Sequence, residues 1–364
     1  MDLIARRLEK LRRLVKKEQV DLFVVAAEPN VRYLTGFTGE ASILLVSPDR
    51  TLLVSDGRFT TQLAEECPGL ELHIRPVGQV LFDALAEVID KLGVRKVGYE
   101  PSSLSVAQFQ TLQEKAKTVE WLGITGRVES LRSVKDESEV EAIRRAVDQA
   151  ERAFAMLRAG LREGDSEKDA ADALEGYLRK CGASAAAFAP IIAVGPRAAL
   201  PHARPTAEAK VGDADFLLID WGASSGAYKS DLTRVLVTGK VTPKFETIYR
   251  TVLAAQEQGI AALRPGVKAE QVDAAARSVI ETAGFGDFFT HGLGHGVGLE
   301  IHENPFFRRH NEVKLKAGMV VTIEPGIYLP DWGGIRIEDD ILITNDGPEV
   351  LTRVPRSLDS VSLR

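Results

Sequence analysis

Four carboxylates in the second half of this sequence stand at or near the ends of apolar runs, where burial is unfavourable. Asp220 ends the run FLLID, and Glu324 ends the run MVVTIE just before a Pro-Gly pair. Asp231 lies in the segment YKSDLTRVLV, and Glu338 lies in GIRIEDDILI. A buried carboxylate is costly unless a cation or hydrogen-bond donors compensate it. The pattern therefore indicates an acidic pocket that binds cations.

A structural interpretation of these acids competes with the pocket. On that interpretation Asp220 caps a turn and Asp231 faces solvent. For these two residues alone, the structural interpretation is favoured over the pocket. Arg336 and Glu338 fall on one face of an alternating strand, where they would form a surface ion pair. The second strand-end acid, Glu324, repeats the arrangement and favours the pocket.

Three of the six histidines fall in HGLGHGVGLEIHE, residues 291–303. His291 and His295 are four residues apart, which on a helix would place both on one face, as in zinc proteases. The glycines of this segment make a helix improbable and favour extended backbone that closely approaches a ligand. A single histidine is usually structural, but the grouping with His302 indicates function. His202, in GPRAALPHARP, is expected on a loop.

Four carboxylates and one imidazole form a ligand set that suits divalent cations such as Mn(II), Co(II) or Zn(II). The four anionic ligands would also roughly neutralise the charge of two such ions. Cysteine offers no alternative site, because Cys67 and Cys181 are far apart and lack CxxC spacing.

An internal repeat is expected to bring the acids together. LREG at 161–164 recurs as LRPG at 263–266, and each is followed by an Ala-rich helical pattern that ends near a glycine, Gly182 or Gly284. The offset is 102 residues in both cases, and the two acid pairs recur at nearly this spacing. Chance similarity of two helix turns is the alternative. The acids favour a duplicated βαβ-type unit whose pseudo-symmetry places both pairs at one central site.

The first part of the chain alternates strand-like and helical patterns, which predicts a small α/β domain. A basic amphipathic helix over 1–19 comes first, and further helices are expected over 80–92 and 104–117. A new helix begins near SVKDESEVEAIRR, capped by Ser133 or Asp136. We therefore expect two domains, 1–130 and 131–364. The expected strands are 21–27, 42–47, 51–55, 70–76, 95–100 and 118–123.

Composition limits the classes of partner. The chain has 364 residues, 45% of them hydrophobic, and a net charge of −6, which gives no electrostatic case for nucleic acid or anionic membrane. No apolar run reaches the ~18 residues of a membrane helix, and no secretory signal pattern is present at the N-terminus. A cytoplasmic, reducing location is the expectation.

With these residues in view, the sequence resembles the pita-bread metallopeptidases, in particular the Xaa-Pro branch that contains aminopeptidase P and prolidase. The matching segments occur in family order, and the N-terminal stretch NVRYLTGFTG resembles a creatinase-type domain. The resemblance implies an α/β creatinase-like N-terminal domain and an α+β pita-bread catalytic domain with an internal pseudo-two-fold repeat. The segments are LPHA, DWG, SDLTR, HGLGHGVGLEIHE, TIEPGIY and GIRIEDD.

The resemblance also implies roles for individual residues. Asp231 and Glu338 would bridge two divalent metal ions, with manganese favoured over cobalt or zinc. Arg336 would orient the carboxylates. The implied metal ligands are Asp220, Asp231, His295, Glu324 and Glu338, and the implied histidines beside the metals are His202, His291 and His302. None of these eight positions is substituted, which argues against the metal-free and catalytically inactive relatives.

The implied reaction is hydrolysis of the bond between an N-terminal residue and proline in short peptides. Glu324 would act as general base, His291 or His302 would stabilise the oxyanion, and His302 would help protonate the prolyl nitrogen. His202 would close over the proline. An aminopeptidase that accepts longer peptides is favoured over a prolidase restricted to dipeptides, and a non-catalytic peptide-binding module is a distant alternative. A homodimer is expected. The sequence does not specify the metal used in vivo or the preferred residue before proline.

Overall fold

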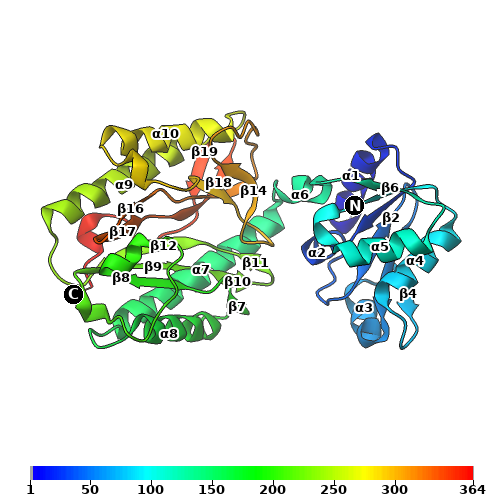
Figure 1. Cartoon of the computed structure of the whole chain (residues 1–364), viewed down its shortest axis with the longest axis horizontal. Helices are drawn as coiled ribbons and strands as arrows, with labels where there is room; N and C mark the ends of the chain where they lie inside the picture. The colour runs from blue at the N-terminus through cyan, green and yellow to red at the C-terminus, as the bar shows by residue number, and fades with distance from the viewer. Residues whose placement is uncertain (1–2, 364) are drawn as a thin grey trace. The chain divides into compact units, whose positions relative to one another are not determined.

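The structure is a computed structural model that describes residues 3–363, so the first two residues of the predicted N-terminal helix lie outside the described residues. The chain divides between Arg132 and Ser133 into two compact units (Figure 1). No helix in the described part of the chain is long and apolar enough to cross a membrane. Cys67 and Cys181 are both free and buried.

The first unit is built on a six-stranded mixed sheet with the order β4-β3-β2-β1-β5-β6. Every strand expected from the apolar runs is present. The parallel pairs are β1–β5, β5–β6 and β3–β4, whereas β2 is antiparallel to both of its neighbours. The strands are β1 (Leu22–Val25), β2 (Ile43–Val46), β3 (Thr51–Asp56), β4 (Glu71–Arg75), β5 (Lys96–Tyr99) and β6 (Glu120–Gly123).

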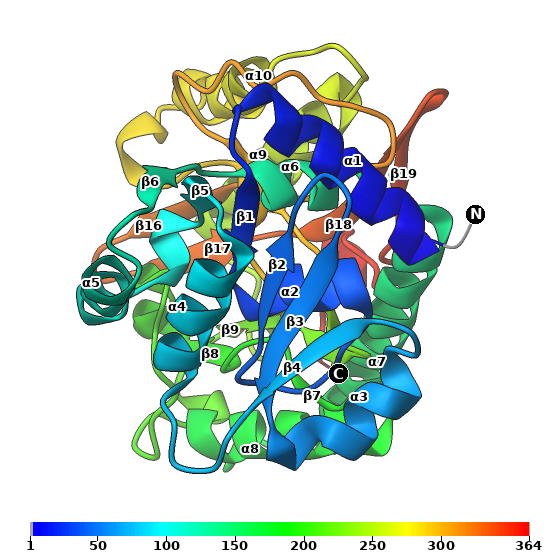
Figure 2. The ribbon, with the colours of Figure 1, turned by 90° about the vertical axis from the view of Figure 1, so that its right-hand side faces the viewer.

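Helices cover both faces of this sheet (Figure 2). The apolar stripes of α4 and α5, including Leu85, Ile89 and Leu112, pack on strand residues such as Val24 and Val54. The helices α1, α2 and α6 contact one another on the other side. The helices are α1 (Leu3–Lys17), α2 (Glu28–Thr35), α3 (Thr60–Glu66), α4 (Leu81–Leu92), α5 (Val106–Lys115) and α6 (Arg127–Arg132).

A buried polar network gives the NVRYLTGFTG segment a structural role. Asn30 is fully buried and donates hydrogen bonds to Glu100 and Glu129, while its side-chain oxygen accepts from Arg132. Glu100 also accepts from the backbone N–H groups that follow β1. Burial raises the pKa of Glu100 to about 7. The network joins α2 to the end of β5 and to α6.

The four long helices of the second unit form two matching pairs. Both bounds of α10 lie 102 residues beyond those of α8, and the glycines that end them, Gly182 and Gly284, have positive φ angles of 99° and 84°. Asp136, one of the two expected caps, closes a capping box on α7. The helices are α7 (Glu137–Gly160), α8 (Glu167–Lys180), α9 (Pro243–Ala262) and α10 (Ala269–Thr282).

The sheets of the second unit repeat in the same order. One sheet runs β12-β9-β8, and the other contains β18-β15-β13, extended by β14 and β19. The helix pairs lie on opposite sides of these strands (Figure 1). A bridge between Thr233 and Glu338 joins the two sheets at their facing strands. The expected pseudo-two-fold repeat is therefore confirmed. These strands are β8 (Ile191–Val194), β9 (Phe216–Trp221), β12 (Leu232–Val237), β13 (Gly294–Gly296), β14 (Glu303–Phe307), β15 (Val320–Ile323), β18 (Asp339–Thr344) and β19 (Gly347–Val350).

A hairpin separates the two acid-bearing strands in each half. In the first half it is β10–β11, and in the second half it is β16–β17. The alternating segment GIRIEDDILI (334–343) is divided between two strands, because β17 pairs with β16 while β18 pairs with β15, and the chain changes partner at Ile337–Glu338. The short strands are β7 (Ala185–Ala186), β10 (Ala223–Ser225), β11 (Tyr228–Lys229), β16 (Gly326–Leu329) and β17 (Gly333–Arg336).

Trp221 fixes β9 to α7 directly beside Asp220, and its loss should destabilise the second unit. The ring is fully buried, stacks on Phe154 at 4.4 Å, and donates a 2.9 Å hydrogen bond to the Ala150 carbonyl. We expect Trp221→Ala to lower the free energy of unfolding by about 3–5 kcal/mol, measured by urea unfolding. Trp221→Phe keeps the stacking and should lose only about 1 kcal/mol. Equal stability of the Ala variant and the parent would contradict this packing.

Candidate metal centre

The two acids of the first half come from neighbouring antiparallel strands. Asp220 is the fifth residue of β9, and Asp231 immediately precedes β12. The register pairs Thr233 with Asp220, so Asp231 lies close to Asp220 at the same end of the pair. Both residues are buried, at 7% and 5% exposure. The structural alternative with a solvent-facing Asp231 is therefore wrong.

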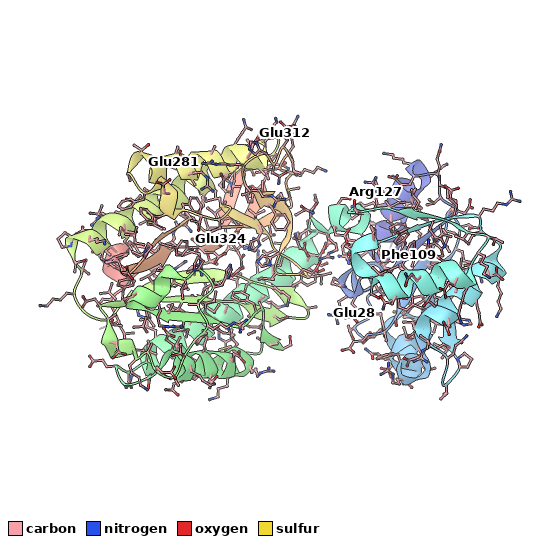
Figure 3. The ribbon with its side chains drawn as sticks, in the orientation of Figure 1. Glu28, Phe109, Arg127, Glu281, Glu312 and Glu324 are labelled. Atoms are coloured by element: carbon pink, nitrogen blue, oxygen red, sulfur yellow. The ribbon has the colours of Figure 1, made fainter. Side chains whose placement is uncertain are left out.

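The second half repeats this arrangement. Glu324 follows β15, and Glu338 immediately precedes β18. Ile335 and Ile337 are fully buried in the apolar core, whereas Arg336 and Glu338 line the cavity. The predicted alternation of this segment is confirmed, but its polar face is enclosed. Glu324 lies in the interior of the unit, while surface acids such as Glu281 lie at its edge (Figure 3).

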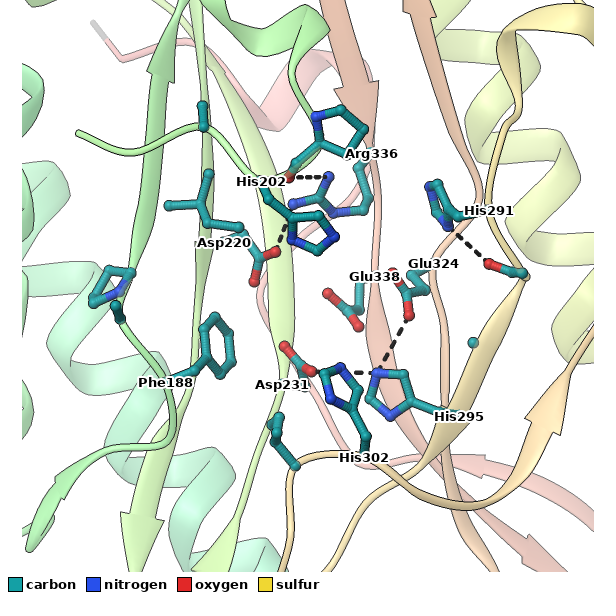
Figure 4. A pocket seen from close by; sticks show the side chains of 18 of the residues that line it. Phe188, His202, Asp220, Asp231, His291, His295, His302, Glu324, Arg336 and Glu338 are labelled. Atoms are coloured by element: carbon teal, nitrogen blue, oxygen red, sulfur yellow. Dashed lines mark hydrogen bonds and ion pairs between the residues drawn. The ribbon is translucent and has the colours of Figure 1, made fainter. Parts of the chain in front are cut away.

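The residues expected as metal ligands converge from both halves on one space (Figure 4). One ligand atom each of Asp231, His295 and Glu338 lies within 4.8 Å of the others. His295 Nε2 is 3.3 Å from Glu324 Oε1 and 3.7 Å from Asp231 Oδ2. Asp220 lines the same cavity. Acids and an imidazole thus face one another at distances suited to shared cations.

The electrostatics of this cluster fit divalent cations. Burial raises the pKa of Asp231 and of Glu338 well above the usual range of carboxyl groups, and repulsion from neighbouring carboxylates adds to the effect. Asp220 Oδ1 is buried and has no hydrogen-bond partner among the described residues. Cations in this space would remove the repulsion and satisfy that oxygen. The donor set of carboxylates and one imidazole is chemically suited to such ions.

His295 is presented in the form that a metal ion needs. Its Nδ1 lies 3.0 Å from the Gly296 carbonyl and can donate a proton to it, so that Nε2 is the nitrogen available to a metal ion. Nε2 is also the atom that faces Glu324 and Asp231. Backbone would collide with a Cβ at Gly294 or Gly296, at 2.1 and 2.4 Å. The glycines let β13 pack closely enough to place this imidazole.

Arg336 holds two of the acids in place through ionic and hydrogen bonds. It forms an ion pair with Asp220 through Nη2 and donates hydrogen bonds to Thr233 Oγ1 at 3.1 Å and to the Tyr328 hydroxyl at 2.8 Å. Thr233 Oγ1 in turn donates to Glu338 Oε2 at 2.7 Å. The guanidinium is almost fully buried, at 3% exposure. It therefore holds one acid from each half in a fixed orientation.

His291 is engaged at both ring nitrogens. Nδ1 donates to the Gly292 carbonyl at 2.8 Å, and Nε2 accepts from the Tyr328 hydroxyl at 2.9 Å. Burial lowers the pKa of His291, which keeps the ring neutral. This geometry orients Tyr328 and Arg336 and leaves His291 no N–H group to offer a ligand.

The other two histidines lie on loops at the cavity. His302 lies between β13 and β14, and its ring stands edge-on to His295 with the ring centroids 4.4 Å apart. His202 lies on the loop after β8. Both side chains are exposed and line the cavity. They can therefore reach a bound molecule, whereas His295 faces the acids.

The cavity is large enough for a short peptide, at about 540 Å³. Its floor is the acidic cluster, and apolar side chains such as Phe188, Ile191 and Ile301 form part of its wall. Two arginines, Arg204 and Arg308, also line it. The cavity thus combines a cation site with apolar walls and positive charge.

Sequence reasoning missed three residues that shape the site. Thr233 and Tyr328 connect Arg336 to Glu338 and His291, and Asp340 accepts a 3.0 Å hydrogen bond from the Asp231 N–H. Burial raises the pKa of Asp340 to about 8. All three stand inside segments that carried the resemblance, SDLTR, TIEPGIY and GIRIEDD. Their position in those segments was the only signal.

Comparisons with known proteins agree with this geometry. Residues 141–345 match metallopeptidase family M24, and residues 7–134 match the Creatinase/Prolidase N-terminal domain. An Xaa-Pro dipeptidase of Pyrococcus furiosus is 37% identical over 97% of this chain and 99% of that protein.

Two solved structures share the architecture of both units. An Xaa-Pro dipeptidase from Bacillus anthracis has a TM-score of 0.93 and 35% identity, covering 98% of this chain and 99% of that chain. An X-Pro aminopeptidase from Thermotoga maritima has a TM-score of 0.86 and 36% identity, covering 95% of this chain and 99% of that chain. The expected creatinase-type and pita-bread architecture is confirmed. The chain belongs to metallopeptidase family M24, a family of metal-dependent hydrolases, and carries a creatinase/prolidase N-terminal domain.

Proposed function

We propose that this chain is an Xaa-Pro dipeptidase that works with two divalent cations, and that these cations are manganese. The observation that carries the proposal is the convergence of five candidate ligands from both halves of the repeat on one cavity. Asp231 and Glu338, which lie nearest the junction of the two sheets, are the proposed bridging ligands. The full proposed set is Asp220, Asp231, His295, Glu324 and Glu338.

The ions would supply the electrophilic chemistry: when bound, they would polarise the scissile carbonyl and lower the pKa of a nearby water. Glu324 is the proposed general base for that water. Its side chain is 17% exposed, compared with 7% for Asp231 and 10% for Asp220. It is therefore the most accessible of these three acids from the cavity, and it can accept a proton there.

Departure of proline needs a proton, because the scissile nitrogen, which is part of the proline ring and carries no hydrogen of its own, would otherwise leave as a strongly basic anion. His302 is the proposed donor, since it lines the cavity beside His295 and is exposed to a bound molecule. His302 is also our choice for contact with the oxyanion. His291 is assigned to orienting Tyr328 and Arg336, because its ring nitrogens are engaged within the chain. His202 would cover the proline from its loop.

The cationic lining favours a dipeptide. In an Xaa-Pro dipeptide the free carboxylate is only one residue from the scissile bond, so it must lie inside the cavity and needs a cationic partner there. Arg308 and Arg204 are the positively charged side chains at the cavity apart from Arg336, which is already paired with Asp220. The dipeptidases among the relatives support the same substrate class.

Hydrolysis of longer peptides is the second candidate, and it was the form favoured from the sequence. The likeness to the X-Pro aminopeptidase from Thermotoga maritima supports it. A non-catalytic binding module is not supported, because every expected ligand is present. We also propose a homodimer, a cytoplasmic location, and a division of roles in which residues 131–364 are catalytic and 1–130 are not.

Removal of one bridging carboxylate tests the cation site. Asp231→Asn should reduce hydrolysis of Ala-Pro by more than about 100-fold, because even loss of groups that only orient metal ligands costs about 10–100-fold. Metal content after dialysis, measured by plasma emission spectrometry, should fall in parallel. Asp346→Asn makes the same change in an exposed turn and should alter neither quantity. A metal-loaded Asp231→Asn variant as fast as the parent would contradict the assignment.

Removal of the proposed proton donor should separate catalysis from metal binding. We expect His302→Ala to lower kcat by about 100-fold or more, the usual contribution of general acid–base catalysis, with the metal content of the parent. His73→Ala, in the first unit, is the control. Loss of metal together with activity would place His302 among the ligands and refute its proposed role.

A comparison of Ala-Pro with Ala-Pro-Ala in added Mn(II) decides between the two substrate classes. A dipeptidase should cleave only Ala-Pro, and Arg308→Ala should raise KM for it about 10-fold or more, since a hydrogen bond to a charged group contributes about 1.5–3 kcal/mol. Arg309→Ala is the matched control, because Arg309 pairs with Glu281 on the surface. Equal cleavage of both peptides, with KM unaffected by Arg308→Ala, would establish the aminopeptidase instead.

A further inference from the structure

A buried ion pair lies directly behind the loop that carries His302. Lys135 Nζ is 3.1 Å from Glu303 Oε2, and the two side chains are 1% and 5% exposed. Glu303 is the first residue of β14 and the neighbour of His302, while Lys135 lies 168 residues earlier, just before α7. Neither residue lines the cavity. Their contact is therefore with the loop and not with a bound peptide.

The lysine end of the pair is firmly held. The Lys135 N–H donates a 2.8 Å hydrogen bond to the Gly318 carbonyl. The next residue, Asp136, caps α7 through a capping box with Glu139. A helix of 24 residues thus begins two residues after Lys135. The backbone of Lys135 is consequently fixed, and its side chain, at 1% exposure, has little free space in which to move.

The glutamate end organises the loop itself. Glu303 Oε1 accepts a 3.1 Å hydrogen bond from the Glu300 N–H, inside the loop that connects β13 and β14. A Cβ at Gly298 would lie 2.8 Å from both carboxylate oxygens, so the loop packs tightly on this group. The Gly298 carbonyl also accepts from the Lys229 N–H at 2.9 Å. The Glu303 carboxylate therefore connects the loop to Lys135 and also joins two parts of the loop to each other.

His302 lies on this loop, at the residue before Glu303. Its side chain is exposed to the cavity, so it lacks the close packing on all sides that fixes a buried ring. Its ring stands edge-on to that of His295, with the centroids 4.4 Å apart (Figure 4). A reactive group that stays accessible has to be positioned through its backbone, and an error of ~1 Å in its place can cost about 100-fold in rate.

We infer that Lys135 and Glu303 form a positioning pair, which fixes the loop so that His302 meets the prolyl nitrogen of the substrate. The inference rests on the peptidase function proposed above. An ion pair suits this task because a charge-assisted hydrogen bond is directional. Loss of Glu303 removes the carboxylate that faces the buried Lys135 ammonium, and loss of Lys135 removes a cation from the buried carboxylate, so the loop should shift in either variant.

The test combines changes in the pair with loss of the histidine. Lys135→Met and Glu303→Gln are made alone and together with His302→Ala, and kcat, KM for Ala-Pro and metal content are measured for each. Alone, each should lower kcat by about 10- to 100-fold while KM and metal content stay close to those of the parent. In the His302→Ala background neither should lower kcat further, because the group through which the pair acts is gone.

A merely structural pair gives a different pattern. It would lower the melting temperature and reduce kcat equally with and without His302, and that result would overturn the inference. Asp56→Asn, which breaks a buried carboxylate's ion pairs in the first unit, should lower stability without changing kcat. If Lys135→Met does not fold, Glu303→Gln serves as the second variant, because it keeps the shape of the side chain and an oxygen that can accept from the Glu300 N–H. Failure of both variants to fold would assign the pair a role in stability and overturn the inference. A parent chain that does not cleave Ala-Pro would refute the proposed function and not this pairing.

Discussion

Repulsion among buried carboxylates is the constraint on which the rest of the second unit depends. Asp231 and Glu338 are almost fully buried, and each lies among other acids that raise its pKa. The chain supplies only part of the compensation, through Arg336 beside Asp220 and through Thr233 beside Glu338. The buried acids therefore require either protonation or cations between them. The site and the stability of its surroundings are linked by that requirement.

Duplication explains how one chain builds such a cluster. In each half a strand ends in an acid, a hairpin reverses the chain, and a second acid precedes the antiparallel return strand. The strand order is the same in both sheets, and the bridge between Thr233 and Glu338 joins them. The hairpin of the second half is longer, and its β16–β17 ribbon brings Tyr328 and Arg336 to the acids. The halves thus share an architecture but contribute different chemistry.

His295 and the other histidines at the cavity are positioned in different ways. His295 is on a strand, where the ladder fixes it, whereas His202, His291 and His302 lie on loops that are held by buried charged side chains. Glu167 of α8 accepts from Arg197 and from the Val194 and Thr206 N–H groups on either side of His202.

On α10, Arg277 is paired with Asp273 and donates to the His291 carbonyl at 2.8 Å. Lys135 and Glu303 do the same beside His302. Buried ion pairs thus hold loop segments that form no strand hydrogen bonds. Separation of such a pair would be costly, because it would leave a buried charge without its partner.

The types of the elements and the residues of the candidate site could be predicted from local sequence patterns. Strands, helices and the repeat followed from periodicity, and the acids and histidines stood out because such groups are unusual in apolar or Gly-rich surroundings. Which side chains meet one another could not be predicted in this way. Lys135 and Glu303 are 168 residues apart, the split of 334–343 between two sheets depends on long-range pairing, and both nitrogens of His291 are engaged through Tyr328 and Gly292. Local patterns carry no information on such contacts, because they arise when segments distant in the chain pack together.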